Sequence, residues 1–315
     1  MRKSAPARLL IAAAMVLLWA GTAHAQEPGL NRVADGDFEA GSVALSLPAV
    51  AQFPMFSGGW ASRGARLPQA IDSGSFEGTS SLRLVTTLDD PVQLLQDVPL
   101  NSAAYGLRFA FLIESGVQTV RLVDDWDRSA PSSGTPAFAA RLSAGAIVFT
   151  TPAGSWHLAV NIERGEWHAL SVIADPRSGN QTVGLDGKPL VTLPGLSVHR
   201  PFTLILGGGA DDSGTFRYDA VELISLVDLE LSTIRATVAH LDITARDDVL
   251  DRLAAAGTAL QRGSPALAMP ELAVARSVLE ASAPATENLR GALTELIELL
   301  EASSDRSGPD LAARH

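Results

Sequence analysis

The sequence predicts a mainly β protein: an antiparallel β-sandwich followed by a C-terminal α-helical hairpin or bundle. Between residues 31 and 226, short apolar segments alternate with Gly, Pro, Ser and Asp, which is typical of antiparallel strands joined by tight turns. Beyond residue 227 the chain becomes rich in Ala and Leu at helical spacing. Because the first stretch has no helical interruption, we expect one large sandwich over residues 27–227. A helical module over residues 228–303 and a disordered tail over residues 304–315 should follow.

Alternation of apolar with polar or small residues marks the individual strands of the sandwich. Inward-facing positions recur at every second residue, as expected of half-buried antiparallel strands. An Asp-Gly pair at residues 186–187 predicts a hairpin, and residues 175–180 predict a turn. The predicted strands rest on residues 203–206, residues 216–226 and the apolar positions Leu82, Leu84, Val92, Leu94, Leu107, Phe109, Phe111, Ile113, Val120, Leu122, Leu170, Val172, Val183 and Leu185.

Four apolar stripes at helical spacing predict the C-terminal module, over residues 229–241, 249–260, 272–279 and 289–300. Thr244 and Asp247 approximate a capping box, Gly263 ends the second helix, and Pro270 precedes the third. The pattern from Leu253 to Gly263 resembles small helical modules at the C-termini of some bacterial surface proteins. From residue 228 onward, eight Arg and no Lys stand against fourteen acidic residues. This charge indicates a solvated face, with docking of a protein partner as the alternative.

The N-terminus has the three parts of a secretory signal peptide. Arg2, Lys3 and Arg8 form a basic start, residues 9–20 are apolar, and Ala23-His24-Ala25 has the small-x-small form of a cleavage site. We expect a signal peptide over residues 1–25 and a secreted or periplasmic protein. The alternative is an uncleaved anchor, but the apolar run is shorter than the roughly 20 residues that a membrane span needs.

Composition excludes several classes of chemistry. The chain has no cysteine, so it has no disulfide, no thiolate metal ligand and no cysteine nucleophile. Its net charge is −11 and its isoelectric point is near 5.0. Nucleic-acid binding needs clustered Lys and Arg, so the net charge argues against nucleic acid, and for the same reason against anionic membranes and acidic glycans.

Separate segments carry a resemblance to known families. Gly36-Asp37-Phe38-Glu39, the turn and strand at residues 74–84, and Tyr218-Asp219-Ala220 together resemble the calcium-stapled jelly roll of carbohydrate-binding modules. Trp167-His168, followed by Asp186-Gly187-Lys188, is similar to laminin-G-like and concanavalin A-like jelly rolls. The resemblance implies a jelly-roll sandwich that binds a glycan or polysaccharide and holds a structural calcium ion.

Asp219 is the carboxylate that the residues themselves point to. Alternation along the last strand places it on one face with Arg217, Val221 and Leu223, a face that turns apolar within two residues. A buried carboxylate without a partner is too costly to be tolerated, so Asp219 needs a compensating group. Calcium is one candidate, and an ordinary ion pair with Arg217 or Arg83 is the other.

The resemblance implies which residues would hold the calcium ion. Glu39 and Asp219 would be side-chain ligands, with Asp37 and Glu77 as further candidates. Calcium takes about 6 to 8 oxygen ligands, and backbone carbonyls of the turns at residues 39–41 and 77–78 can supply the rest. The ion would have a structural role.

Tryptophans are the candidate platforms for a sugar ring, because the apolar face of a pyranose packs on an aromatic side chain. Trp126 is the candidate ligand contact, since it lies in an acceptor-rich segment beside a Pro- and Ser-rich loop, and plain packing within that loop is the alternative. Its polar neighbours, the other candidate ligand residues, are Asp124, Asp125, Asp127 and Arg128. Trp60 and Trp167 are expected in the core, and Trp156 and Trp167 are expected on paired strands.

The catalytic motifs that we sought do not occur in the sequence. It has no strand with the paired carboxylates of a concanavalin A-like glycosidase, no His-Glu-x-x-His and no Gly-x-Ser-x-Gly. We therefore predict an exported, non-catalytic, lectin-like protein. The alternative is a structural or adhesion-type envelope protein that binds other proteins, and the third possibility is a glycan-active enzyme of unrecognised type.

Overall fold

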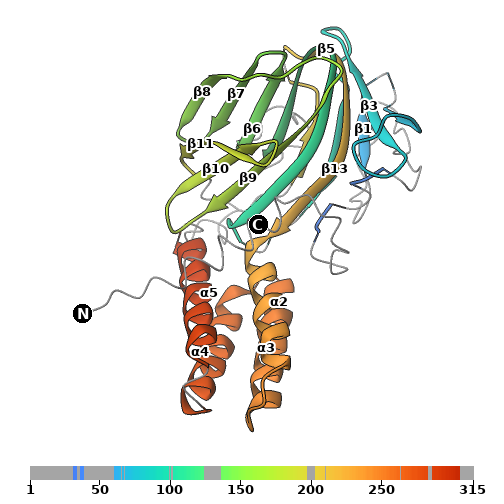
Figure 1. Cartoon of the computed structure of the whole chain (residues 1–315). Coiled ribbons are helices and arrows are strands. Elements are labelled where there is room, and N and C mark those ends of the chain that lie inside the picture. Colours follow the sequence, from blue (N-terminus) through green and yellow to red (C-terminus); the bar gives the residue numbers. More distant parts are fainter. Residues whose placement is uncertain are drawn as a thin grey trace, which may run out of the picture. The chain divides into compact units, whose positions relative to one another are not determined.

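The computed structural model describes residues 31–33, 36–38, 60–64, 66, 68–98, 100, 102–123, 136–196, 203–209, 211–262, 264–282 and 286–305. The chain forms two compact units, the β-rich Asn31–Leu223 and a helical part that follows from Ile224 (Figure 1). The predicted signal peptide, Glu39 and residues 124–128 around Trp126 lie outside the described residues. Those predictions stay predictions.

Thirteen strands make up the β-rich part of the described chain, and their printed pairings are all antiparallel. They are β1 (Ala61–Arg63), β2 (Gln69–Ile71), β3 (Ser81–Thr86), β4 (Gln93–Asp97), β5 (Tyr105–Val123), β6 (Pro136–Ser143), β7 (Ala146–Thr151), β8 (Gly154–Ala159), β9 (Trp167–Asp175), β10 (Asn180–Leu185), β11 (Lys188–Pro194), β12 (Thr203–Leu206) and β13 (Ser213–Ser225).

Strand β5 is long enough to belong to both layers of a β-sandwich. Its first half pairs with β9, and its second half pairs with β6 and β12. Neighbouring strands therefore follow the order β2-β3-β13-β5-β9-β10-β11 in the first layer and β1-β4-β12-β5-β6-β7-β8 in the second layer. The predicted antiparallel sandwich over most of the chain, followed by helices, is confirmed.

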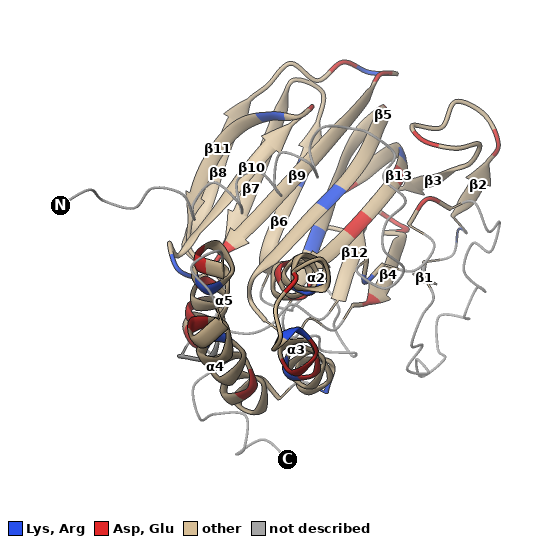
Figure 2. Ribbon diagram, turned by 60° about the horizontal axis from the view of Figure 1, so that its bottom comes forward, with Lys and Arg blue, Asp and Glu red and all other residues tan. Residues whose placement is uncertain are grey.

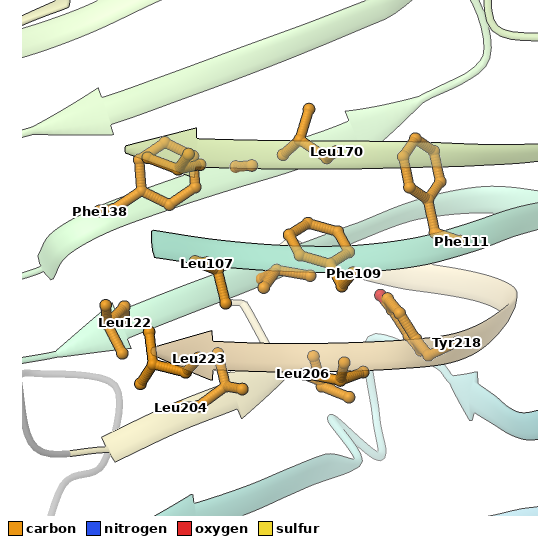
Figure 3. Close-up of a cluster of buried hydrophobic side chains, with 14 of the residues drawn as sticks. Leu107, Phe109, Phe111, Leu122, Phe138, Leu170, Leu204, Leu206, Tyr218 and Leu223 are labelled. Atoms are coloured by element: carbon orange, nitrogen blue, oxygen red, sulfur yellow. The ribbon is translucent and has the colours of Figure 1, made fainter. Parts of the chain in front are cut away.

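A single large hydrophobic core lies between the two layers. Phe109 and Phe111 of β5, Phe138 of β6 and Leu170 of β9 are fully buried in it, as predicted from alternation for Phe109 and Phe111 (Figure 3). Burying one such side chain stabilises the fold by roughly 1.5–3 kcal/mol. Trp60 also lies in this core, as expected.

A chain of hydrogen bonds between buried polar groups crosses three strands of the core. The Tyr218 hydroxyl donates to Gln118 Oε1 over 3.0 Å, and Gln118 Nε2 donates to the carbonyl of Leu84 over 3.1 Å. Because a buried polar atom without a partner costs about 1–3 kcal/mol, these bonds fix β13, β5 and β3 in one register.

The last strand does not keep the alternation that the sequence predicted. Ala220 has a positive φ of 46°, so the chain shifts by one residue there. Tyr218 and Leu223 both point into the core (Figure 3), together with Val221, whereas Arg217 and Asp219 lie on the opposite side. The prediction that Arg217 and Asp219 share a face with Val221 and Leu223 is therefore wrong, because periodicity cannot show a left-handed residue.

Sequence reasoning missed the strands β6 and β7 of the second layer and anticipated β8 only through Trp156. Trp156 lies on β8 opposite Phe149 of β7, whereas Trp167 lies on β9 opposite Leu112 of β5. The expectation that Trp156 and Trp167 occupy paired strands is wrong.

The second unit contains the helices α2 (Leu226–Ala239), α3 (Arg246–Gln261), α4 (Pro265–Ser282) and α5 (Glu287–Asp305). Each helix adjoins two others, α2 with α3 and α5, and α4 with α3 and α5, which makes a four-helix bundle. Every helix has four buried residues at spacings of four, three and four: Val227, Leu231, Ile234, Val238; Val249, Leu253, Ala256, Leu260; Ala268, Leu272, Ala275, Leu279; Leu289, Leu293, Leu296, Leu300. This spacing is typical of bundle packing. Helix α5 also buries Ala292, Leu299 and Ser303.

Two local predictions about the helices need correction. Helix α3 begins after Ala245 with no side-chain cap, so the capping box of Thr244 and Asp247 does not form. Pro270 lies inside α4, five residues after the helix begins, rather than before it. Acidic residues occur on α3, α4 and α5 (Figure 2), and none of the described helices is long and apolar enough to span a membrane.

Candidate functional site

Asp219 lies at the centre of the site that the sequence singled out. Its side chain is completely buried at the shift in β13. Asp219 Oδ2 accepts hydrogen bonds from the backbone N–H groups of Phe76 (2.8 Å) and Glu77 (3.0 Å), and Oδ1 accepts one from Ala220 N–H (2.7 Å). Burial raises the pKa of Asp219, although the three N–H groups favour the ionised form. The carboxylate thus fastens the loop between β2 and β3 to β13.

The three segments that the sequence analysis linked do converge on β13. Residues 76–77 contact Asp219, and Val221 N–H donates to the carbonyl of Gly36 over 2.9 Å. The neighbouring Phe38 is buried against Trp60, with ring centroids 5.7 Å apart. The predicted approach of segments that are far apart in the sequence is therefore observed.

The described residues fit a calcium ion only in part. Backbone N–H groups already engage both oxygens of Asp219, and the described part of the chain contains no group of three or more His, Asp and Glu side chains arranged to hold a metal. Glu39 lies outside the described residues. The alternative prediction, an ion pair of Asp219 with Arg83 or Arg217, is wrong. Both arginines bond to Glu114 instead.

Two charged triads lie beside this loop on the side of the first layer that faces away from the core. Glu114 accepts from Arg83 (3.0 Å) and from Arg217 (2.8 Å). Burial raises the pKa of Glu114, but the two arginines outweigh it and lower the pKa below its ordinary value.

The second triad has the opposite composition. Arg108 Nη2 lies 3.1 Å from Glu77 Oε1, and Arg108 Nη1 lies 3.8 Å from Glu222 Oε2. Figure 2 shows basic and acidic residues next to one another on the central strands. Arginine hydrogen-bond donors and glutamate hydrogen-bond acceptors are therefore both held in place on this surface.

An aromatic pair adjoins the second triad. Trp167 of β9 and Phe76 of the loop have ring centroids 6.0 Å apart, and the Arg108 guanidinium lies 5.9 Å from the Phe76 ring. Trp167 Nε1 donates to the carbonyl of Gly74 over 2.8 Å. Both aromatic side chains are half-buried. The expectation that Trp167 packs in the core is wrong, because its neighbour His168 takes the inward position on β9.

His168 has a structural partner on each ring nitrogen. Its Nδ1 lies 2.9 Å from Asp186 Oδ2, and its Nε2 accepts from Glu163 N–H over 3.3 Å. Since Nε2 accepts, Nδ1 carries the proton and donates to Asp186. The pair joins the start of β9 to the turn between β10 and β11.

Sequence reasoning missed Phe76, Arg108, Glu114 and Glu222 as members of this surface. Arg108 and Glu114 are the charged residues in the otherwise largely apolar first half of β5, which was the available signal. Phe76 had no such signal, because its position depends on the bonds between its loop and Asp219.

No protein-family model and no curated protein matches this chain. Among solved structures it is similar to a sialidase, with 12% identity and a TM-score of 0.41, over 62% of this chain and 21% of the sialidase chain. It is similar to carbohydrate-binding module CBM66 from Bacillus subtilis, with 12% identity and a TM-score of 0.35, over 52% and 95% of the two chains. It also resembles the Ca²⁺/Man3GlcNAc-bound exoplasmic domain of VIP36, with 12% identity and a TM-score of 0.37, over 53% and 85%.

Proposed function

We propose that the chain is an exported, non-catalytic carbohydrate-binding protein whose sandwich is laminin-G-like. One observation carries the proposal: the half-buried Trp167–Phe76 pair is held among fixed charged groups on the side of the first layer away from the core. The apolar face of a pyranose packs on such rings, while carboxylates and guanidinium groups bond to its hydroxyls.

The contacts around the pair favour a preorganised platform. The bond from Trp167 to Gly74, the bonds from Phe76 and Glu77 to Asp219, and the Arg108–Glu77 pair all fasten the loop to the strands beneath it. A platform that is fixed before binding loses less conformational entropy when the sugar arrives.

Trp126, with Asp124, Asp125, Asp127 and Arg128, is the second candidate contact for the same function. These residues belong to the proposal on the sequence argument alone, because they lie outside the described part of the chain. A solvent-facing Trp126 would contribute little to stability, so replacing it should affect binding and leave the melting temperature almost unchanged.

A structural calcium ion held by Glu39 and Asp219, with Asp37 and Glu77 as further candidate ligands, is also part of the proposal. The convergence of residues 36–38 and 76–77 on β13 supports it, because a metal ion is one means of joining distant segments. Export rests on the N-terminal sequence.

The test is a glycan array probed with and without calcium, followed by titration of any glycan that binds. Trp167→Ala should weaken binding about tenfold or more, since truncating an aromatic anchor of a binding site typically costs about 2 kcal/mol or more. Trp126→Ala tests the second location in parallel.

Trp156→Ala is the matched control, because Trp156 is also half-buried but lies on β8 in the other layer. Melting curves of all three variants separate lost contact from lost fold. If the wild type binds no glycan in the presence of calcium, the proposal fails and the envelope-protein alternative becomes the better account.

A further inference from the structure

The charge of the chain is distributed unevenly over the two layers. The chain carries a net charge of −11, yet residues 128–162 contain no Asp and no Glu. Strands β6, β7 and β8 fall in this range, and their charged or titratable residues are Arg141 and His157. Strands β6, β7 and β8, which are neighbours in the second layer, therefore let an anion approach without meeting a carboxylate on any of the three.

Strand register aligns the polar side chains of these strands on the side away from the core. Thr119, Arg141, Val148 and His157 lie opposite one another from β5 to β8. Arg121, Ala139, Thr150 and Ser155 form the next row. Their neighbours Leu142, Ile147 and Phe149 occupy the core, so both rows face outward. Arg121 and Arg141 are diagonal neighbours, within reach of a single ligand.

Neither arginine of this surface has an ion pair among the described residues. Arg121 Nη2 donates to the carbonyl of Gly208 (3.3 Å), and Arg141 Nη2 donates to the carbonyl of Asp211 (3.4 Å). By contrast, Arg83, Arg108 and Arg217 in the first layer all bond to glutamates. The two guanidinium groups are thus oriented by carbonyls and keep most of their donors.

Arg121 shows that this arrangement is costly without an anion. Its Nε atom is buried and has no hydrogen-bond partner, and burial lowers the pKa of the guanidinium. Among the described residues, Asp212 is the acidic group that acts on Arg121 through its charge. Asp212 itself is engaged by the N–H and hydroxyl of Thr119 and by the N–H of Gly209.

We propose that the outward surface of β5, β6, β7 and β8 binds the carboxylate of an acidic sugar, with Arg121 and Arg141 as its anion contacts. A guanidinium matches a carboxylate in a bidentate pair. The hydroxyls of Thr150 and Ser155 lie two and three strands from Arg121 in the same row, where they can bond to the hydroxyls of the sugar. Two arginines are too few for a phosphate polymer, which needs a larger cluster of cations. The ligand class is a polysaccharide that contains uronic acids.

The experiment measures binding of the full chain to polygalacturonate and to the same polymer with its carboxyl groups reduced. The wild type should bind the acidic polymer, more weakly as salt concentration rises, and should not bind the reduced polymer. Arg141→Gln should weaken binding about ten- to hundredfold, the range expected for a lost charged hydrogen bond. Arg141→Lys should restore part of it, because lysine keeps the charge but lacks the planar fork.

Arg164→Gln is the matched control, because Arg164 is exposed in the β8–β9 connection and its loss changes the net charge equally. Ser155→Asp is a second variant, at an exposed position on β8, which should repel the acidic polymer without touching the core. Melting curves check that the variants fold.

Three results would overturn the proposal. The first is an equal loss of polygalacturonate binding in Arg141→Gln and Arg164→Gln. The second is binding of the carboxyl-reduced polymer as tight as that of polygalacturonate. The third is equally tight binding of phosphatidylglycerol vesicles or single-stranded DNA. Trp167→Ala should leave polygalacturonate binding unchanged, so this proposal and the glycan platform of the first layer fail separately.

Discussion

The Asp219 carboxylate accepts three backbone N–H bonds, two of them from a loop more than 140 positions away in the sequence. Such bonds stabilise a buried carboxylate in the way that a cation would. Asp219 therefore holds the β2–β3 loop in place whether or not a metal is bound, and a metal would add to this clasp rather than create it.

The calcium prediction can be checked through stability. If Glu39 and Asp219 bind calcium only in the folded state, a hundredfold excess over the dissociation constant should add about 2.7 kcal/mol to the free energy of unfolding. The melting temperature should rise with calcium and fall back with chelator in the wild type. Glu39→Gln is the informative variant, because it removes a proposed ligand and leaves the Asp219 clasp intact.

An identical melting curve with calcium and with chelator would contradict the calcium prediction for the wild type. The three backbone bonds to Asp219 would then be the whole of the stabilisation at this position. Asp219→Ala should destabilise the fold under either condition, since it leaves the N–H groups of Phe76 and Glu77 without their acceptor.

At the scale of elements, the bend of β5 depends on two strands passing very close to each other. Gly116 has a φ of 73°, and a Cβ atom built there would collide with the backbone of Ser213 and Gly214 at the start of β13. Thr215 N–H donates to Ser115 Oγ over 3.2 Å at the same point. The two layers can share β5 only if these backbones keep this approach.

Gly116→Ala should therefore destabilise the sandwich by more than Gly145→Ala. Both glycines have positive φ, 73° and 82°, and each substitution carries the left-handed backbone penalty of roughly 1–2 kcal/mol. A Cβ atom at Gly145 meets nothing within 4 Å, so only Gly116→Ala adds a collision. Denaturant unfolding of both variants measures the difference, and equal losses would show that the backbones can move apart at no cost.

Alternation predicted β3, β5, β9 and β10 because each of them has one face in the core and one outside it. It did not identify β6, which is rich in Ala, a residue that is uncommon in strands, or β7. The available signals were the alternation of Phe138, Ala140 and Leu142 in β6 and of Ile147 and Phe149 in β7. For the helices, spacing predicted all four, but the start of α4 was misplaced because Pro270 was taken as a boundary.

The candidate site was predictable only in part, for a related reason. The sequence motifs predicted that residues 36–38, residues 76–77 and Asp219 lie close together, and the structure agrees. The left-handed conformation of Ala220 changes which side chains share a face, and no residue type signals it. The position of Phe76 depends on the bonds between its loop and Asp219. The Trp167–Phe76 pair therefore follows from tertiary contacts rather than from a local sequence pattern.

At the scale of the whole molecule, the distribution of charge is more informative than its sum. The net charge of −11 argued against acidic glycans, but the acidic residues are absent from residues 128–162 and frequent in the helices. Attraction between exposed charges is screened beyond about 8–10 Å at moderate salt concentration, so a ligand on β6 to β8 responds mainly to nearby groups. This is why an acidic chain can offer a surface for an anion.

The division into two units predicts that the sandwich folds without the helices. Asn31–Leu223 contains one continuous core, and the helices bury their own apolar residues against one another. A chain that ends at Ser225 should therefore be soluble, show the circular dichroism of a β protein and unfold in one cooperative transition. It should also keep the binding of the full chain to any glycan that contacts Trp167 or Arg141, because both residues lie in the sandwich.

A molten or insoluble product would mean that the sandwich needs the helices to fold. Loss of glycan binding in a shortened chain that folds cooperatively would mean instead that the helices contribute to the binding surface.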